Sequence, residues 1–260
     1  MKILTFCSFK GGTGKTSAAL HIAAALAKFH DKKVLAVDFD SQANLSIGLG
    51  IGADELRTIG SVLQEELAIQ DVIQHTIIKN LNLIPSNAYL DGIERTSSLM
   101  RDPYAHERLR TLLKKVKNNY DFCFIDTPPS LGWLTQTAFF AADHSIICAI
   151  PEAYSILALR RLKEFQESIE KYHEISVLGV ILSFWDERGM INKDFLNEIN
   201  HYYPNLVFNT KIRRDIVVSR SVLKGITVFE SSKEERAGKD YKKLTQELLE
   251  RINKFCIPYV

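Results

Sequence analysis

Residues 2–17 read Lys-Ile-Leu-Thr-Phe-Cys-Ser-Phe-Lys-Gly-Gly-Thr-Gly-Lys-Thr-Ser, and this stretch decides the fold. Its first part, 2–8, is a short apolar run typical of a buried strand, and its glycines mark a loop. Apolar residues then recur at helical spacing, at Ala18, Ile22, Leu26 and Phe29. The order of strand, glycine-rich loop and helix is the context that a phosphate-binding loop requires.

The loop at 10–17 has the chemistry of a nucleotide phosphate site. Its glycines allow a tight turn whose N–H groups approach phosphate oxygens, where a Cβ atom would crowd. The positive end of the following helix adds to this anion site. We expect Lys15 to pair with the β- and γ-phosphates and the Thr16 hydroxyl to ligate Mg²⁺. The sequence therefore predicts ATP with Mg²⁺ as cofactor, bound by Lys10, Gly11, Gly12, Thr13, Gly14, Lys15, Thr16 and Ser17.

Outward from the loop, short apolar runs alternate with helical patterns along the chain. We expect strands at 2–8, 33–38, 81–85, 121–126, 145–150, 177–183 and 206–212. We expect helices at 15–29, 59–66, 105–118, 133–142, 155–172, 192–202, 215–224 and 236–255. The glycines in 41–75 indicate a loop there. This alternation predicts an α/β fold, a mainly parallel twisted sheet with helices on both faces, in one domain spanning 1–260.

Two strand ends supply carboxylates near the loop. Residues 34–40, Val-Leu-Ala-Val-Asp-Phe-Asp, place Asp38 and Asp40 at alternate positions after a buried run. The strand expected at 121–126 ends in Asp126, which is followed by Thr-Pro-Pro-Ser. An acid at this place beside a phosphate loop holds Mg²⁺, here through a water. The two prolines restrict φ, so this segment moves between few shapes.

The sequence resembles a known family at these motifs. Residues 7–16, Cys-Ser-Phe-Lys-Gly-Gly-Thr-Gly-Lys-Thr, resemble the deviant Walker A motif of the ParA/MinD ATPases, and 34–42 resemble their V-L-L-I-D-x-D-P-Q motif. The resemblance implies that Lys10 reaches the ATP of a partner protomer, while Lys15 acts within its own chain. It implies that Asp40 orients the attacking water, and that Asp38 lies close to Mg²⁺ without ligating it directly. The catalytic set is then Lys10, Lys15 and Asp40.

Later segments resemble the ParA branch that partitions chromosomes and plasmids, the Soj-like proteins. They are 134–143, 179–188 and 210–214, the last of which lies beside the nucleotide in that branch and implies a contact from Arg214. The resemblance implies a slow ATP hydrolase that dimerises on ATP binding and binds DNA without sequence preference. A ParB-like centromere-binding protein would stimulate hydrolysis and so reset the dimer.

The segment 188–224 is locally basic, with seven Lys or Arg residues against three acids. Arg213 stands where the family has proline, and Arg220 where it has glutamate. Contacts to a DNA backbone need such cations near phosphates and weaken with salt. We therefore expect DNA binding by Arg188, Lys193, Arg213, Arg220 and Lys224. The alternative is a charged face that is only solvated.

Composition limits the other function classes. The net charge of the 260 residues is +2, so the molecule as a whole is not a strongly basic polyanion binder. The four cysteines lie far apart, which disfavours zinc and disulfide sites, and three of them lie in apolar runs typical of buried thiols. No segment approaches the roughly 20 apolar residues of a membrane span, so we expect a cytoplasmic protein, and the resemblance to ParA proteins implies that it associates with the nucleoid.

Two other functions stay open. The first is a MinD-like positioning ATPase that cycles on membranes through a C-terminal amphipathic helix. Mixed charges at 239–250 disfavour this, since a membrane-surface helix prefers a uniformly basic polar face. The second is a metabolic enzyme of the dethiobiotin synthetase type, for which the sequence offers no additional acid–base cluster.

Overall fold

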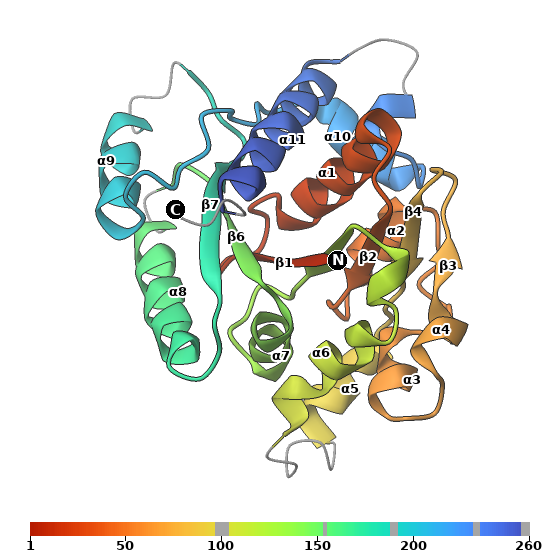
Figure 1. Cartoon of the computed structure of the whole chain (residues 1–260). Helices are drawn as coiled ribbons and strands as arrows, with labels where there is room; N and C mark the ends of the chain where they lie inside the picture. The colour runs from red at the N-terminus through yellow and green to blue at the C-terminus, as the bar shows by residue number, and fades with distance from the viewer. Residues whose placement is uncertain (97–103, 153–154, 188–191, 231–234, 256–260) are drawn as a thin grey trace.

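A computed structural model describes residues 1–96, 104–152, 155–187, 192–230 and 235–255. Its centre is a sheet in the order β3-β4-β2-β5-β1-β6-β7 (Figure 1). The strands are β1 (Lys2–Cys7), β2 (Val34–Asp38), β3 (Gln74–His75), β4 (Leu81–Ile84), β5 (Phe122–Asp126), β6 (His144–Ala149) and β7 (Ser176–Leu182). The pairs are parallel except β3–β4. The expected α/β class with a mainly parallel sheet is confirmed.

Helices cover both faces of this sheet (Figure 1). One face carries α1 (Lys15–His30), α2 (Asn44–Gly48), α10 (Ile216–Leu223) and α11 (Arg236–Phe255). The other carries α3 (Ile59–Leu63), α4 (Ile69–Val72), α5 (Tyr89–Thr96), α6 (Arg108–Lys114), α7 (Trp133–Ala141), α8 (Ser155–Glu170) and α9 (Asn192–Tyr202). Short 3₁₀ turns are η2 (Ala105–Glu107), η3 (Lys117–Asn119) and η4 (Val228–Glu230).

The strands feed two separate apolar cores because successive side chains point to opposite faces. In β1, Leu4 and Phe6 pack in the core beneath α1 and α11, while Ile3 and Cys7 pack in the core on the other side. Burial on both faces explains why the strands read as nearly continuous apolar runs. Parallel pairing places the carboxyl ends of β1, β2 and β5 side by side, and the phosphate loop and the carboxylates follow these ends.

The cysteines behave as expected of buried thiols. Cys7, Cys123 and Cys148 are free and buried, and burial raises the pKa of Cys148 to about 12. The fourth, Cys256, lies outside the described residues. No helix in the described part of the chain is long and apolar enough to cross a bilayer.

The prediction of a strand at 206–212 is wrong. This segment runs beside β7 but forms only isolated bridges, from Val207 to Val180 and from Arg213 to Trp185. Side chains of α11 take the place of a continuous ladder. The Arg251 guanidinium donates to the carbonyls of Leu206 (2.7 Å) and Val207 (2.8 Å). The Glu247 carboxylate accepts from the amides of Asn209 (2.7 Å) and Thr210 (2.9 Å).

Other differences concern short elements. The helix expected at 105–118 is divided into η2, α6 and η3, and the one expected at 59–66 ends at Leu63. The loop expected across 41–75 contains α2, α4 and β3, and α5 follows at 89–96. These elements have two to eight residues, so they show too few turns or alternations for periodicity to reveal. The remaining strands and helices agree with expectation to within about two residues, the usual scatter of such bounds.

Candidate functional site

The phosphate-loop residues form a tight, glycine-rich turn between β1 and α1. Gly12 and Gly14 have φ of 77° and 81°, in the left-handed region that favours glycine. A Cβ atom on Gly14 would lie 2.8 Å from the Ser183 hydroxyl, so only glycine fits there. Gly14 also caps α1 without any side-chain hydrogen bond, which leaves the first-turn amides of the helix to a ligand. The local geometry therefore matches the expected anion cradle.

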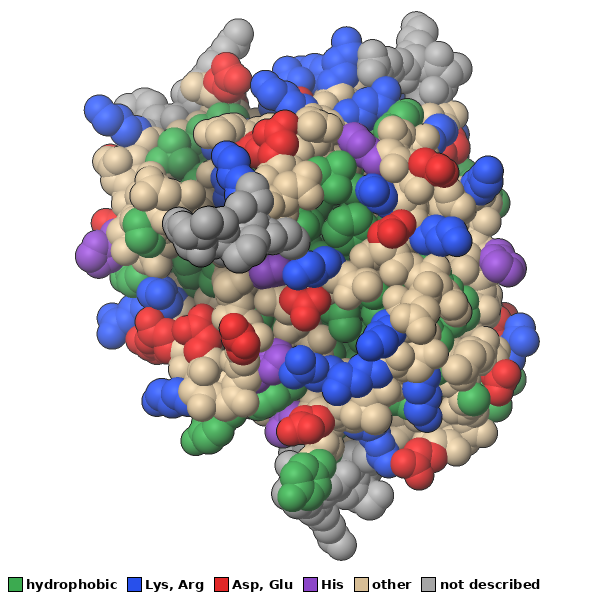
Figure 2. Space-filling view, viewed as in Figure 1, with side chains coloured by type: hydrophobic (Ala, Val, Ile, Leu, Met, Phe, Trp, Pro, Cys, Tyr) green, Lys and Arg blue, Asp and Glu red, His purple; other side chains and the backbone are tan. Residues whose placement is uncertain are grey.

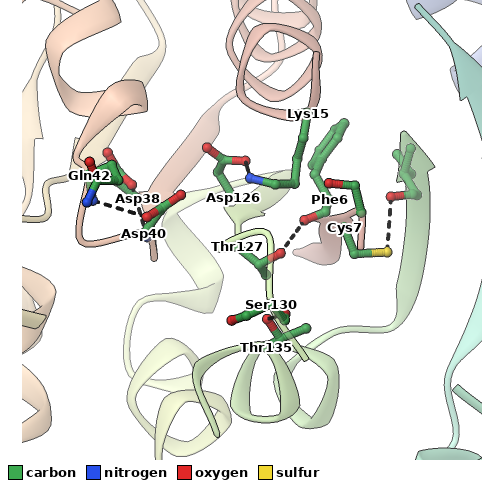
Figure 3. Close-up of polar contacts among 12 residues, drawn as sticks. Phe6, Cys7, Lys15, Asp38, Asp40, Gln42, Asp126, Thr127, Ser130 and Thr135 are labelled. Carbon is green, nitrogen blue, oxygen red and sulfur yellow. Dashed lines mark hydrogen bonds and ion pairs between the residues drawn. The ribbon is translucent and has the colours of Figure 1, made fainter. Parts of the chain in front are cut away.

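Lys15 and Asp126 form a buried ion pair at the base of this loop (Figure 3). Lys15 Nζ lies 3.0 Å from Asp126 Oδ1, and the two side chains are 7% and 0% exposed. Burial alone would lower the pKa of Lys15, but the Asp126 carboxylate more than offsets this and the net pKa is raised. The second carboxylate oxygen, Asp126 Oδ2, is buried without a hydrogen-bond partner. The end of β5 and the first residue of α1, 111 residues apart in the sequence, thus form one charged pair.

Asp38 is fully buried and hydrogen-bonded on the side of α2. Its Oδ2 accepts from the Ser46 amide and the Ser46 hydroxyl, both at 2.8 Å, and its Oδ1 accepts from the Asp40 amide at 3.2 Å. Ser46 Oγ in turn accepts from the Ser86 amide at 3.1 Å. Burial, and then the nearby Asp126 charge, raise the pKa of Asp38 to about 7. Asp38 is therefore fixed in place, and its carboxyl group gives up its proton less readily than an ordinary aspartate.

Asp40, in contrast, lines a cavity. It is 6% exposed and accepts from the Gln42 amide at 3.1 Å (Figure 3). Burial raises its pKa, while the Lys15 cation opposes that shift. The cavity holds about 530 Å³ and is lined by Ser8, Asp40, Gln42, Asn44, Pro129, Phe184, Val218, Ser219, Val222, Leu223 and each residue from Lys10 to Ser17. The structure thus brings the expected loop residues and Asp40 to one hollow.

Lys10 lies at this cavity but pairs within its own chain. Its ammonium forms an ion pair with Glu152, which follows β6, and the two side chains are 40% and 51% exposed. Exposed pairs of this kind contribute little, about 0–1 kcal/mol, so the contact is easily exchanged. Its expected role toward a partner protomer stays a prediction.

Arg214 lies in a neighbouring cavity rather than this one. That cavity holds about 760 Å³ and is lined by Ile150, Pro151, Glu152, Phe184, Trp185, Asp186, Glu187, Arg213, Arg214 and Arg236. Phe184, with φ of 53°, lines both cavities and marks their junction. A nucleotide extending past Phe184 would meet Arg214, so its expected contact stays a prediction.

The expected DNA-binding residues come from different helical layers, and their role in binding DNA stays a prediction. Arg220 and Lys224 are exposed at the end of α10, but Lys193 lies in the first turn of α9, which belongs to the opposite helical layer. Arg213 donates two hydrogen bonds to the Asp240 carboxylate, at 2.9 and 2.7 Å. Arg188 lies outside the described residues. On the face seen in Figure 2, basic and acidic side chains are intermingled, with small groups of each sign.

Several residues of the site escape sequence reasoning. Thr127 donates its hydroxyl to the Phe6 carbonyl at 2.8 Å, and Thr135 donates to the Ser130 carbonyl at 2.6 Å (Figure 3). These bonds fasten both ends of the Pro128–Ser130 turn that follows Asp126. For Thr127, the sequence offers one sign of a role, because this residue directly follows the acid that ends β5. Nothing in the sequence marks Ser46, which lies eight residues from Asp38 outside any motif, or Glu152, which lies 142 residues from Lys10.

The donors present fit a nucleotide with Mg²⁺. Thr16 lines the cavity, and Asp126, which pairs with Lys15 of the loop, has a buried oxygen, Oδ2, without a hydrogen-bond partner. Hard oxygen donors of these kinds are the ones that Mg²⁺ prefers. Elsewhere in the described ranges, no group of three His, Cys, Asp or Glu side chains could hold another metal ion.

Comparisons with known proteins agree with this geometry. Residues 1–177 match the family described as AAA domain. A ParA family protein of Chlamydia trachomatis serovar D is 47% identical over 249 residues, covering 96% of this chain and 98% of that protein. The sporulation initiation inhibitor protein Soj of Bacillus subtilis is 32% identical over 252 residues, covering 95% and 98%.

Solved structures share the whole fold. A variant of McdA from Cyanothece in complex with ATP has a TM-score of 0.86 at 25% identity, covering 97% of this chain and 96% of that one. Cobyrinic acid a,c-diamide synthase from Mycobacterium smegmatis, with bound ATP analog and magnesium, has a TM-score of 0.84 at 24% identity, covering 98% and 97%, and this likeness concerns the fold alone. The relatives at 47% and 32% identity span nearly the whole chain, and the chain therefore belongs to the ParA family of P-loop ATPases.

Proposed function

We propose that this ParA family protein is an ATP-driven switch in which ATP binding forms a homodimer, the dimer holds DNA without sequence preference, and hydrolysis resets it. One observation carries the proposal. Helix α10 lines the nucleotide cavity with Val218, Ser219 and Val222, and the same helix presents Arg220, with Lys224 directly after it, to solvent. A nucleotide in the cavity and a phosphate backbone outside would therefore contact one short element.

Binding would use the loop and its charged base. Lys15 and the unsatisfied loop amides would hold the phosphates, and Thr16 with Asp126 would hold Mg²⁺ through hydroxyl and carboxylate oxygens. Mg²⁺ supplies positive charge that neutralises the phosphate oxygens when it is bound. The fit of these donors and the ATP bound by the McdA neighbour support ATP as the cofactor, with Mg²⁺ held by the hydroxyl and carboxylate oxygens.

Hydrolysis would use Asp40. Its carboxylate lines the cavity beside Lys15 and is fixed by the Gln42 amide, so it can accept a hydrogen bond from a water and orient that water toward the terminal phosphate. Phosphoryl transfer depends mainly on positioning and charge stabilisation. Lys10 would exchange its exposed pairing with Glu152 for the partner protomer's phosphates, which would make the dimer depend on ATP.

DNA would be held through α10 in both protomers. Arg220 and Lys224 are four residues apart and exposed, so their cations can approach successive phosphates. Arg213 contributes less to this surface because Asp240 already occupies its guanidinium. A ParB-like stimulating partner and a location on the nucleoid complete the proposal, and both are supported by the relatedness to Soj and other ParA family proteins.

A charge-reversal pair tests the DNA arm. Arg220→Glu is expected to weaken the affinity of the ATP-bound protein for a DNA duplex, while ATP hydrolysis without DNA stays unchanged. Lys79→Glu, an equal charge change at an exposed position in the turn before β4, is the matched control and is expected to retain affinity. Equal losses in the two variants, or none in either, would mean that α10 is only a solvated face.

A further inference from the structure

Two helix ends meet glycine against glycine beside the nucleotide cavity. Gly50 follows α2 and Gly225 follows α10, and their φ values are 84° and 63°. A Cβ atom on Gly225 would lie 2.8 Å from Gly50 Cα and 3.2 Å from the Gly50 nitrogen. A Cβ atom on Gly50 would lie 3.3 Å from the Gly225 carbonyl oxygen. The backbones are thus closer than any side chain would allow.

Both ends are closed in the same way. After α2, the Gly50 amide donates to the Ile47 carbonyl at 3.0 Å, and the Ile51 amide donates to the Ser46 carbonyl at 2.9 Å. After α10, the amides of Gly225 and Ile226 donate to the carbonyls of Val222 (3.0 Å) and Ser221 (3.1 Å). Each pattern is a Schellman cap with glycine at the left-handed position. Two rigid caps therefore abut, so a shift of one helix end displaces the other.

The first cap is connected to the nucleotide site. Ser46, whose carbonyl closes it, donates its amide and its hydroxyl to Asp38. The α2 segment also follows directly from Asp40, Gln42 and Asn44, which line the cavity. Helix α2 therefore carries any displacement of this segment to Gly50.

The second cap is connected to the cations at the end of α10. Lys224 directly precedes Gly225 and Arg220 directly precedes Ser221, whose carbonyl closes the cap. Both side chains are exposed. Movement of Gly225 therefore repositions two cations without any contact between them and the nucleotide.

We propose that the contact between Gly50 and Gly225 couples the state of the nucleotide site to the position of the basic end of α10. Its DNA readout rests on the proposed function, but the coupling itself does not, because the response of α10 to ATP can be measured without DNA. The two glycines are positioning residues in this scheme. Direct contact of a nucleotide with α10 is the competing route, since Val218 and Val222 line the same cavity.

The test uses the full chain and two substitutions at the contact between Gly50 and Gly225. Gly225→Ala places a Cβ atom in the contact and a strained residue at positive φ. Gly225→Asn places the same Cβ atom there but tolerates the left-handed backbone, which protects the fold. Gly92→Ala is the control, because a Cβ atom at Gly92 meets nothing within 4 Å. All variants are first required to unfold cooperatively and to bind ATP.

Hydrogen exchange with ATP and with ADP gives the first readout. In the wild type and in Gly92→Ala, ATP is expected to change exchange both in the phosphate loop (11–17) and in 216–226. In both Gly225 variants the loop response is expected to persist while the response of 216–226 disappears. The proposed coupling through Gly50 and Gly225 would be overturned by an undiminished response of 216–226 in Gly225→Asn, or by no response there in the wild type.

DNA affinity gives the second readout. The ratio of affinities with ATP and with ADP is expected to fall toward one in the Gly225 variants, from a wild-type value of about 5–150, the usual range of coupling between sites. An unchanged affinity ratio in the Gly225 variants would overturn the proposed coupling. A wild-type ratio of one would overturn the proposed DNA function instead, and the exchange experiment would still decide the coupling.

Discussion

Lys15 Nζ and Asp126 Oδ1 lie 3.0 Å apart with both side chains buried, so the cation at the base of the phosphate loop is already balanced by a carboxylate of its own chain. A nucleotide that takes up Lys15 must compete with this pair. The same exchange would free Asp126, whose second oxygen already lacks a partner. Binding of the phosphates by Lys15 would therefore release the Asp126 carboxylate to take up another ligand.

Loss of the lysine should affect both binding and stability. Lys15→Ala is expected to abolish ATP binding, because the loop amides alone do not supply its charge. It is also expected to lower the free energy of unfolding by about 3–5 kcal/mol, since it leaves a buried carboxylate without its cation. Calorimetric titration with ATP and urea unfolding measure the two effects. The double variant Lys15→Ala/Asp126→Asn should regain stability but not binding, and normal ATP affinity in a folded Lys15→Ala protein would contradict the assignment.

Asp40 should matter for hydrolysis and not for binding. Asp40→Ala is expected to slow ATP turnover by about 10²–10⁴-fold, the usual effect of losing a group that manages the proton of the attacking water. ATP binding should persist, so the ATP-bound form accumulates and is detectable by nucleotide analysis after gel filtration. Asp54→Ala, at an exposed acid further along the same connection, is the control. Unimpaired turnover would remove Asp40 from this role.

Lys10 should act between protomers. Lys10→Ala is expected to bind ATP normally, because Lys10 is exposed and paired with Glu152 and its loss leaves the buried Lys15–Asp126 pair intact. It should no longer sediment as a dimer with ATP. Glu152→Gln removes the intrachain partner but keeps Lys10, and should still dimerise. If Lys10→Ala forms the ATP-dependent dimer as readily as the wild type, the deviant lysine has no function across the interface.

His21 should make the fold sensitive to acid. Its ring is buried between α1 and α11, stacks on Tyr241 with ring centroids 4.6 Å apart, and bonds the Ser17 carbonyl at 2.7 Å. Burial lowers its pKa from 6.5 to about 4. The unfolded chain therefore binds the proton first, and the contribution of neutral His21, fully present above pH 6.5, is lost as the pH falls toward 4.

The comparison that isolates this effect is with His21→Phe, which keeps a ring against Tyr241 but does not titrate. Between pH 6.5 and 4 the free energy of unfolding of the wild type should fall more steeply than that of the variant, as measured by urea unfolding at several pH values. Parallel curves would mean that His21 does not set the acid limit.

The sequence reveals the site where chemistry and chain order coincide. The glycines and Lys15 lie in one continuous loop, and Asp40 and Asp126 each follow a buried run, so parallel pairing of β1, β2 and β5 necessarily brings them to one edge. The order of helices and strands is predictable for a similar reason, because apolar strands joined by connections long enough to cross over pair in parallel.

The remaining features depend on pairings that no local pattern encodes. Lys10 and Glu152 are 142 residues apart, and Arg213 and Asp240 are 27 apart. The apolar run at 206–212 has the composition of a strand, but Arg251 and Glu247 of α11 bind its backbone groups. A basic count over 188–224 likewise ignores that α9 and α10 belong to opposite layers of the molecule.

The most direct test of the proposed function is retention of DNA by the wild-type protein with ATP, with ADP and without nucleotide, each at about 50 and 200 mM salt. If the ATP-bound protein holds the phosphate backbone, DNA is retained with ATP only, and this retention is lost at the higher salt. Binding releases cations from the DNA, and their release is less favourable when the salt concentration is high. Equal retention in the three nucleotide states, or none with ATP at the lower salt, would contradict the account.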